Sequence, residues 1–119
     1  MVEIENFRKL MVWNKAHLLT LDVYKITDLF PKHELYALVS QMRRATVSVV
    51  ANIVEGTKRK TANDRRHFFV MADTSLEELK YFFILSYDLK YMDVENGKML
   101  MEKSREVGRM LNGLMNSLK

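Results

Sequence analysis

The sequence predicts an all-α fold, an antiparallel up-and-down four-helix bundle, on the basis of three observations. Apolar and small residues recur at alternating spacings of four and three in four separate segments, and this spacing gives a helix one buried stripe. Short connections join the segments, so consecutive helices are expected to pack side by side in opposite directions. The length of 119 residues suits one domain, residues 1–119, whose core needs no disulfide or structural metal.

The first helix is expected from Leu10 to Leu29, after a short arm that Phe7 and Leu10 dock onto the bundle. It should end before Pro31, because the residue preceding a proline is pushed out of the helical region. Pro31 in turn suits the start of the second helix, where a missing N–H costs little. The apolar row of the first helix is Val12, Ala16, Leu19, Val23, Ile26 and Phe30.

The second helix is expected from Lys32 to Glu55, with Gly56 as its C-terminal cap. Its apolar row is Leu35, Leu38, Met42, Ala45 and Val49. Its second half is apolar on most sides, so it must be covered on more than one face. It could be a central helix in a deep core, or it could face another subunit. A homo-oligomer is favoured, because 119 residues offer little protein to cover a second face. The expected interface residues are Val47, Val50, Ala51 and Val54.

One narrow polar stripe follows the same helix. Its members are Gln41, Arg44, Ser48, Asn52 and Glu55. The stripe could bind a ligand, but pairing inside the protein is the favoured interpretation, because most such polar groups find local partners. Gln41 and Asn52 are then expected to bond to neighbouring helices, and Glu55 to pair with Arg59 four residues on.

The third helix is expected from Ala62 to Leu89, capped by Thr61 or Asn63. Its row of apolar and small residues is Phe68, Ala72, Ser75, Leu79, Phe82, Ser86 and Leu89.

The fourth helix is expected to begin after Asp93, a suitable N-cap, and to reach Leu118. Its row is the shortest: Val107, Leu111, Leu114 and Leu118. It contains Gly97, Gly108 and Gly113. Each glycine weakens a helix by about 1 kcal/mol relative to alanine, so this helix should be the least stable.

A basic cluster lies between the second and third helices. Residues 55–67 hold five basic and two acidic side chains, a net charge of +3 out of the chain's +4, and His67 adds charge when protonated. The basic residues are Lys58, Arg59, Lys60, Arg65 and Arg66. A cluster on a loop and first helical turn can contact phosphates; the alternative is an ordinary solvated turn. No aromatic residues interleave the charges, so base stacking is not expected.

Catalytic and metal-binding patterns are missing from the sequence. There is no cysteine, which excludes thiolate metal sites and cysteine nucleophiles. The histidines His17, His33 and His67 lack the Glu-x-x-His spacing of bundle metal sites. No glycine-rich phosphate loop or Ser/His/Asp grouping is present. The protein is therefore expected to be no enzyme and to carry no cofactor or metal. The polar N-terminus and the absence of a long apolar run suggest a cytoplasmic protein with no membrane contact.

Several stretches resemble one known family. They are residues 12–16 (VWNKA), 30–36 (FPKHELY), 41–48 (QMRRATVS), 52–56 (NIVEG) and Arg59. They resemble the small four-helix bundle proteins named for intervening sequences of 23S ribosomal RNA genes. That family is similar in fold to the accessory variability determinant of diversity-generating retroelements.

The resemblance covers roughly residues 7–92 and implies a ring-shaped homopentamer. For the retroelement relatives it also implies a basic surface that binds nucleic acid and a reverse transcriptase. Thr74 departs from the family pattern, which often has glycine there, and should alter close helix approach. The signature positions carried over are Arg43, Arg44, Asn52, Glu55, Gly56 and Arg59.

The sequence thus predicts a non-enzymatic, oligomeric nucleic-acid-binding or accessory protein that uses a basic surface. Its partners are expected to be further copies of itself, RNA or DNA and, by resemblance, a reverse transcriptase. The alternative is a structural protein–protein interaction module with no nucleic-acid role. The basic cluster favours the first interpretation over the second.

Overall fold

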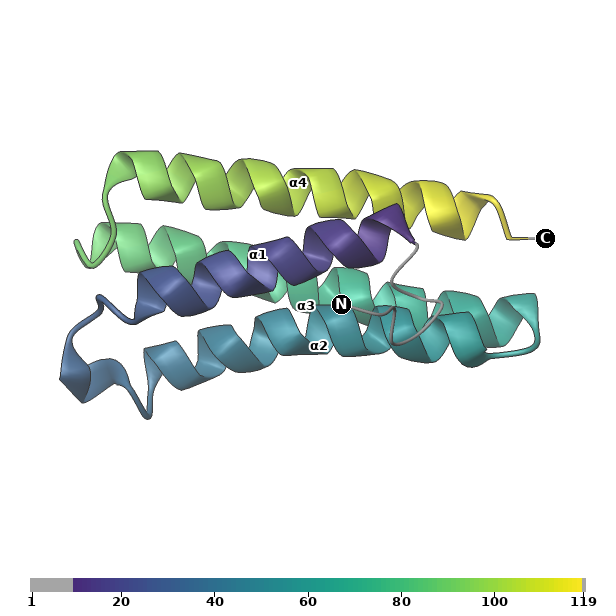
Figure 1. Cartoon of the computed structure of the whole chain (residues 1–119), viewed down its shortest axis with the longest axis horizontal. Helices are drawn as coiled ribbons and strands as arrows, with labels where there is room; N and C mark the ends of the chain where they lie inside the picture. Colours follow the sequence, from purple (N-terminus) through teal and green to yellow (C-terminus); the bar gives the residue numbers. More distant parts are fainter. Residues whose placement is uncertain (1–9, 119) are drawn as a thin grey trace, which may run out of the picture.

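The computed structural model describes residues 10–118, and this part of the chain folds into four long α-helices with no strand (Figure 1). The helices are α1 (Met11–Thr27), α2 (Leu38–Lys58), α3 (Ala62–Asp88) and α4 (Val94–Asn116), with a short 3₁₀ turn, η2 (Lys32–Glu34), between the first two. Consecutive helices run antiparallel, and α4 returns beside α1, so each helix packs against two neighbours. The predicted all-α four-helix fold is confirmed.

The predicted start of the second helix is wrong. Pro31 leads into η2, and α2 begins only at Leu38. The side chain of Glu34 holds this connection, since its carboxylate accepts hydrogen bonds from the Leu38 N–H (3.4 Å) and from the Tyr91 hydroxyl (2.8 Å). Leu35, expected in the apolar row, consequently lies on the surface.

The predicted end of the second helix is also wrong. Gly56 lies inside α2, which continues to Lys58, and no glycine in the described range has a positive φ. Gly56 is needed for space instead. A Cβ there would lie 2.8 Å from Cδ1 and 2.9 Å from Cζ of the Phe69 ring. The glycine therefore allows the start of α3 to approach α2 closely.

The bundle core contains the whole predicted row of α1, from Val12 to Phe30. In α3 the buried row differs from the prediction by one residue at three positions, and Leu89, expected at the end of the row, is exposed. The buried members are Phe69, Ala72, Leu76, Leu79, Phe83 and Ser86. The residues expected instead, Phe68, Ser75 and Phe82, are only half-buried. Neighbouring residues are turned by about 100° on a helix, so both rows read as apolar and only packing decides between them.

Polar side chains bridge the helices around this core. The hydroxyls of Ser48 and Ser75 lie 2.9 Å apart between α2 and α3, and those of Thr20 and Thr46 lie 2.9 Å apart between α1 and α2. Lys103 of α4 pairs with Asp22 of α1. These contacts fix the axial register of neighbouring helices, because a shifted helix would leave the same groups without partners.

The N-caps of the last two helices are as predicted. The Thr61 hydroxyl accepts a hydrogen bond from Asp64 N (3.1 Å), and the Asp93 carboxylate accepts one from Asn96 N (2.7 Å). Between α3 and α4, Lys90 takes up a left-handed conformation with φ 65°. Helices α1, α3 and α4 end within two residues of their predicted limits.

Two further expectations concern the N-terminal arm and Thr74. Leu10 is half-buried and packs against the core, as expected, whereas Phe7 lies outside the described residues. Thr74 is exposed, and its hydroxyl donates to the Val70 carbonyl (3.0 Å). It therefore does not alter a close helix approach, and that expectation is wrong. No helix within residues 10–118 has the length and apolar character to cross a membrane.

Candidate functional site

The basic turn, residues 58–66, joins α2 to α3 at one end of the bundle (Figure 1). Lys58 ends α2, and Thr61 caps α3, so the connection is very short. Lys58 and Lys60 are exposed, and neither side chain has an ion pair or hydrogen bond to the described residues. Two exposed ammonium groups without a partner among the described residues therefore lie on a short connection between two helices.

Arg59 organises the basic turn. Its guanidinium donates to Glu55 Oε2 at 2.8 Å and lies 4.5 Å from the centre of the Phe68 ring. Its carbonyl accepts a 2.7 Å hydrogen bond from Arg65 Nε. The expected Glu55–Arg59 pair is thus confirmed. The cation–π contact and the two hydrogen bonds stabilise this conformation of the turn.

Arg66, unlike the other four members of the predicted cluster, packs against the C-terminal end of α4. It is half-buried, and its Nη2 donates to the carbonyls of Met115 (3.5 Å) and Leu118 (3.1 Å). Its positive charge lies where the C-terminal end of α4 carries partial negative charge. The structure therefore brings four predicted residues together on one exposed turn and places the fifth between α3 and α4. With Glu55 and Asp64 included, the exposed turn has a net charge of +2.

The remaining signature positions are mostly explained by packing. Arg43 donates to Asp28 Oδ1 (2.8 Å) and to the Thr27 hydroxyl (3.1 Å), and its guanidinium lies over the Tyr24 ring, so it binds α2 to the end of α1. Asn52 donates to the carbonyl and hydroxyl oxygens of Ser48, within its own helix.

The polar stripe of α2 is therefore only partly paired as expected. Asn52 bonds within α2 and not to a neighbouring helix. Arg44 and Gln41 are exposed, and their side chains have no hydrogen bond to the described residues.

The expected subunit interface is partly exposed. Val47 is 44% exposed and Ala51 is also exposed, whereas Val50 and Val54 are half-buried and pack against the core of their own chain. On the neighbouring helix α1, Leu21 is 51% exposed. Thr20 and Thr46 are in contact between α1 and α2, and Leu21 and Val47 are the residues that follow them. Because the two helices run antiparallel, a turn of about 100° on each brings both side chains to the same side of the helix pair. The exposed apolar surface therefore spans both helices.

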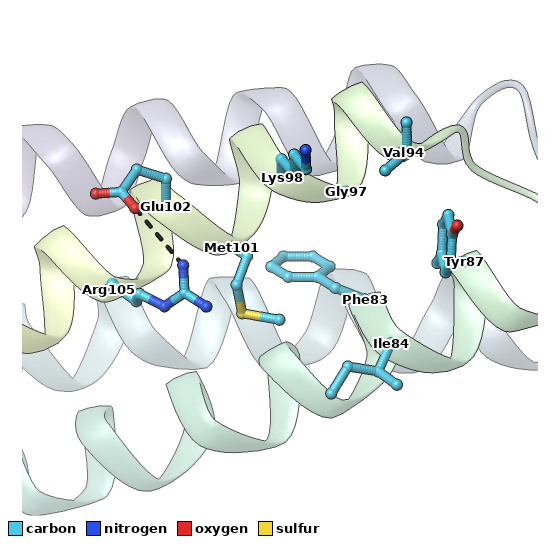
Figure 2. Close-up of a pocket in the computed structure, with 9 residues that line it drawn as sticks. All are labelled: Phe83, Ile84, Tyr87, Val94, Gly97, Lys98, Met101, Glu102 and Arg105. Atoms are coloured by element: carbon cyan, nitrogen blue, oxygen red, sulfur yellow. Dashed lines mark ion pairs between the residues drawn. The ribbon is translucent and has the colours of Figure 1, made fainter.

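A second surface feature, the α3–α4 groove, was missed from the sequence. It has a volume of about 600 Å³. Figure 2 shows the residues that line it: Phe83, Ile84, Tyr87, Val94, Gly97, Lys98, Met101, Glu102 and Arg105. The sequence signal was present, since Ile84, Tyr87 and Val94 are apolar residues outside the predicted rows. Predicting the groove needed the packing of α3 on α4.

One polar cluster links the two other connections of the bundle. The Tyr91 hydroxyl donates to Glu34 Oε2 at 2.8 Å and lies 3.5 Å from His33 Nε2. The hydrogen bond to the Glu34 carboxylate raises the pKa of Tyr91 above 10.0, and partial burial and the Glu34 charge act in the same direction. Among residues 10–118, no group of three acidic or histidine side chains is placed to hold a metal ion.

Comparisons with known proteins identify the family. The family model described as 23S rRNA-intervening sequence protein matches residues 8–113. No curated protein matches the sequence. A crystal structure from Bacteroides thetaiotaomicron, described as a protein with unknown function from the S23 ribosomal protein family, superposes with a TM-score of 0.82 at 19% sequence identity. The match covers 89% of this chain and 96% of that chain, which establishes the shared fold. Because the family model spans most of the sequence, the chain belongs to the family of 23S rRNA-intervening sequence proteins.

Proposed function

We propose that this protein is a non-enzymatic, oligomeric nucleic-acid-binding protein whose basic turn contacts phosphates. The observation that carries the proposal is the state of Lys58 and Lys60. Both are exposed and without an ion pair among the described residues, on a turn that Arg59 and Arg65 hold together. Free cations on a held backbone can neutralise phosphates without first breaking internal salt bridges.

The geometry of the turn favours binding that tolerates many sequences. Beside the turn, the Arg59 guanidinium lies over the Phe68 ring, and the neighbouring His67 ring is exposed. Only the small His67 imidazole is therefore open to a base next to the turn, and phosphate contacts are the main interaction. Such contacts position a nucleic acid and carry no base information themselves.

Assembly belongs to the same proposal. The exposed apolar residues Val47, Ala51 and Leu21 support contact with further copies of the chain. The family resemblance supports a homopentameric ring and, for the retroelement relatives, a reverse transcriptase partner. A ring would repeat the basic turn around its axis and strengthen the field that attracts a polyanion. We place this activity in the cytoplasm, in keeping with a sequence that has no cysteine.

A gel-shift titration with duplex RNA and duplex DNA at two salt concentrations tests the phosphate contact. The test variant replaces Lys58, Arg59 and Lys60 by glutamine. Since the Arg59 change also removes the contacts of that side chain, Lys58→Gln/Lys60→Gln is made as well. The matched control replaces three exposed lysines elsewhere, Lys25, Lys32 and Lys90, by glutamine.

Wild type and control are expected to bind with an affinity that falls steeply with salt. Both test variants should bind more weakly, and the slope of log affinity against log salt should fall by about one for each phosphate that the variant no longer neutralises. Equal binding by all four proteins would show that this turn is not the site. No binding by wild type at low salt would favour the alternative, an interaction module that uses the exposed apolar surface of α1 and α2.

A further inference from the structure

The α3–α4 groove combines an apolar floor with a cation at one end. The Phe83 side chain forms the floor with only 1% of its surface exposed, while Ile84 and Val94 on the walls are about half exposed. In Figure 2 Tyr87 and Val94 lie at one end, and Met101 lies over the middle beside Phe83. The Arg105 guanidinium lies at the other end (Figure 2). From Val94 to Arg105 the groove runs for about 16 Å along α4.

Arg105 has unused binding capacity. Its only ion pair among the described residues is with Glu102, at 3.6 Å, and its guanidinium donates no hydrogen bond to them. Glu102 also faces Arg109, at 3.7 Å. Lys98, one helical turn before Glu102, has no ion pair to the described residues. Arg105 and Arg109 therefore share one carboxylate, and Lys98 lies one turn away without an ion pair in the described part of the chain, which leaves an excess of positive charge between Lys98 and Arg109 on α4.

Gly97 keeps the groove open. It lines the groove, and the nearest atom to a Cβ built there is the Met92 Cε, at 3.6 Å. A Cβ at this position makes only an ordinary van der Waals contact, and because Gly97 lines the groove, a larger side chain there is expected to extend into it.

We propose that the groove binds a single-chain amphiphile with an anionic head, of the fatty-carboxylate class. The guanidinium of Arg105 offers parallel N–H donors that match a carboxylate, and Lys98 adds charge nearby. The alkyl chain lies between α3 and α4 against Phe83, Ile84 and Met101, where it leaves water. Ligand sites between the helices of a bundle commonly join an apolar lining to a few polar groups.

The geometry favours a free amphiphile over a bilayer or a peptide helix. The apolar side chains line a hollow between two helices instead of projecting from a convex surface, so one alkyl chain reaches them more readily than a membrane does. An amphipathic helix would need apolar anchors along several turns. Here α3 contributes only the single turn Phe83–Tyr87 to the lining.

The experiment is a titration of the full chain, labelled at its methionine methyl groups, with dodecanoate monitored by NMR. Dodecanol and dodecyltrimethylammonium serve as neutral and cationic probes of the same chain length. The two ionic probes are kept below their micelle concentrations and dodecanol below its solubility limit. Dodecanoate is expected to shift the Met101 signal to saturation and to leave that of Met71, exposed elsewhere on α3, unchanged. Dodecanol should bind about tenfold or more weakly, because it lacks the charge-assisted pair.

Variants locate the site and test the charge. Gly97→Leu should abolish the Met101 shift, whereas Gly113→Leu, at a glycine of the same helix with no atom within 4 Å of its Cβ position, should preserve it. Arg105→Glu should weaken dodecanoate binding by about tenfold or more and favour dodecyltrimethylammonium instead. Lys25→Glu, an exposed lysine on α1, should change neither affinity.

Four results would overturn the proposal. They are equal affinity for dodecanoate and dodecanol, equal shifts of all exposed methionines, and a Met101 response to anionic vesicles but not to dodecanoate. The fourth is a pair of observations: wild type does not bind dodecanoate, and light scattering shows that Gly97→Leu no longer forms the oligomer that wild type forms. That result would make the groove a subunit contact.

Discussion

At the scale of single residues, Gly56 is the glycine with the least room for a side chain. Gly56→Ala would place a methyl group against the ring of Phe69, which is itself buried, so the ring or helix α3 must move. We expect the free energy of unfolding to fall by about 1–3 kcal/mol, as for other overpacked sites. Urea unfolding followed by circular dichroism measures this difference.

Gly113→Ala is the matched control for this substitution. Gly113 lies within α4, and no atom lies within 4 Å of its Cβ position. Alanine there should raise the free energy of unfolding by about 0.5–1 kcal/mol through helix propensity alone. If both alanine variants were stabilised, the approach of Phe69 would not be what requires glycine at position 56.

The pair of Tyr91 and Glu34 predicts a pH dependence. The pKa of Tyr91 is raised in the folded protein by its hydrogen bond to Glu34. Because the folded pKa exceeds the unfolded one, the stabilisation is fully present below the unfolded pKa of about 10 and is lost as the pH rises through the folded pKa. The stability difference between wild type and Tyr91→Phe should therefore be constant near neutral pH and shrink in alkaline solution.

Urea unfolding at several pH values, with ¹³C NMR of the tyrosine ring carbons, checks this expectation. Tyr36→Phe, at a tyrosine that is 92% exposed, serves as the control and should show no such change. In Glu34→Gln, Tyr91 should ionise at lower pH than in wild type. Ionisation of Tyr91 together with the other tyrosines of the wild type would contradict the prediction.

Hydrogen bonds and ion pairs of single side chains were predictable from the sequence where the two partners are close along the chain. The caps Thr61 and Asp93 and the Glu55–Arg59 pair each involve residues three or four positions apart. The contact of Arg66 with the end of α4 was not predicted, because its partners, Met115 and Leu118, are near the other end of the sequence. Local hydrogen-bonding rules carry no information about such distant carbonyls.

At the scale of helices, α4 is expected to be the least protected. It contains three of the four glycines of the chain. Its amides should exchange with solvent faster than those of α2 and α3, since glycine raises the cost of keeping a helix formed. Native-state hydrogen exchange measures this, and Gly113→Ala should slow exchange near the end of α4. Equal protection in all four helices would show that packing outweighs propensity.

For α3 the sequence predicts the limits of the helix but not which face is buried. Its extent was predicted within one residue, because Thr61 caps the start and the apolar pattern fades after Leu89. Its inward face was predicted wrongly at Phe69, because Phe68 and Phe69 are equally apolar neighbours. The choice between them depends on α2, where Gly56 gives space to one ring only. Helix orientation is a property of the packed pair and cannot be read from one segment.

At the scale of the whole molecule, the exposed apolar surface of α1 and α2 predicts self-association. Val50→Glu or Val54→Glu should weaken it, but both side chains also pack on the core of their own chain. Val47→Glu is the cleaner test, because Val47 is already 44% exposed in the isolated chain. A charge there should weaken association by several kcal/mol, since the carboxylate would be buried in the interface without a partner.

Light scattering at tens of micromolar checks this prediction. Val70→Glu, at an α3 valine that is 47% exposed, is the matched control and should keep the oligomer. A monomeric wild type at this concentration would contradict self-association. Loss of assembly in Val70→Glu but not in Val47→Glu would move the subunit contact to α3.

The unbroken α3 helix keeps the two proposed sites far apart. The helix extends from the basic turn to the α3–α4 groove, and Arg65 and Ile84 are separated along it by about 28 Å. Distant sites without shared partners contribute independently to binding. The two sites should therefore show no thermodynamic coupling: saturating dodecanoate should leave both the affinity for RNA and its salt dependence unchanged, so that one chain holds both ligands at once.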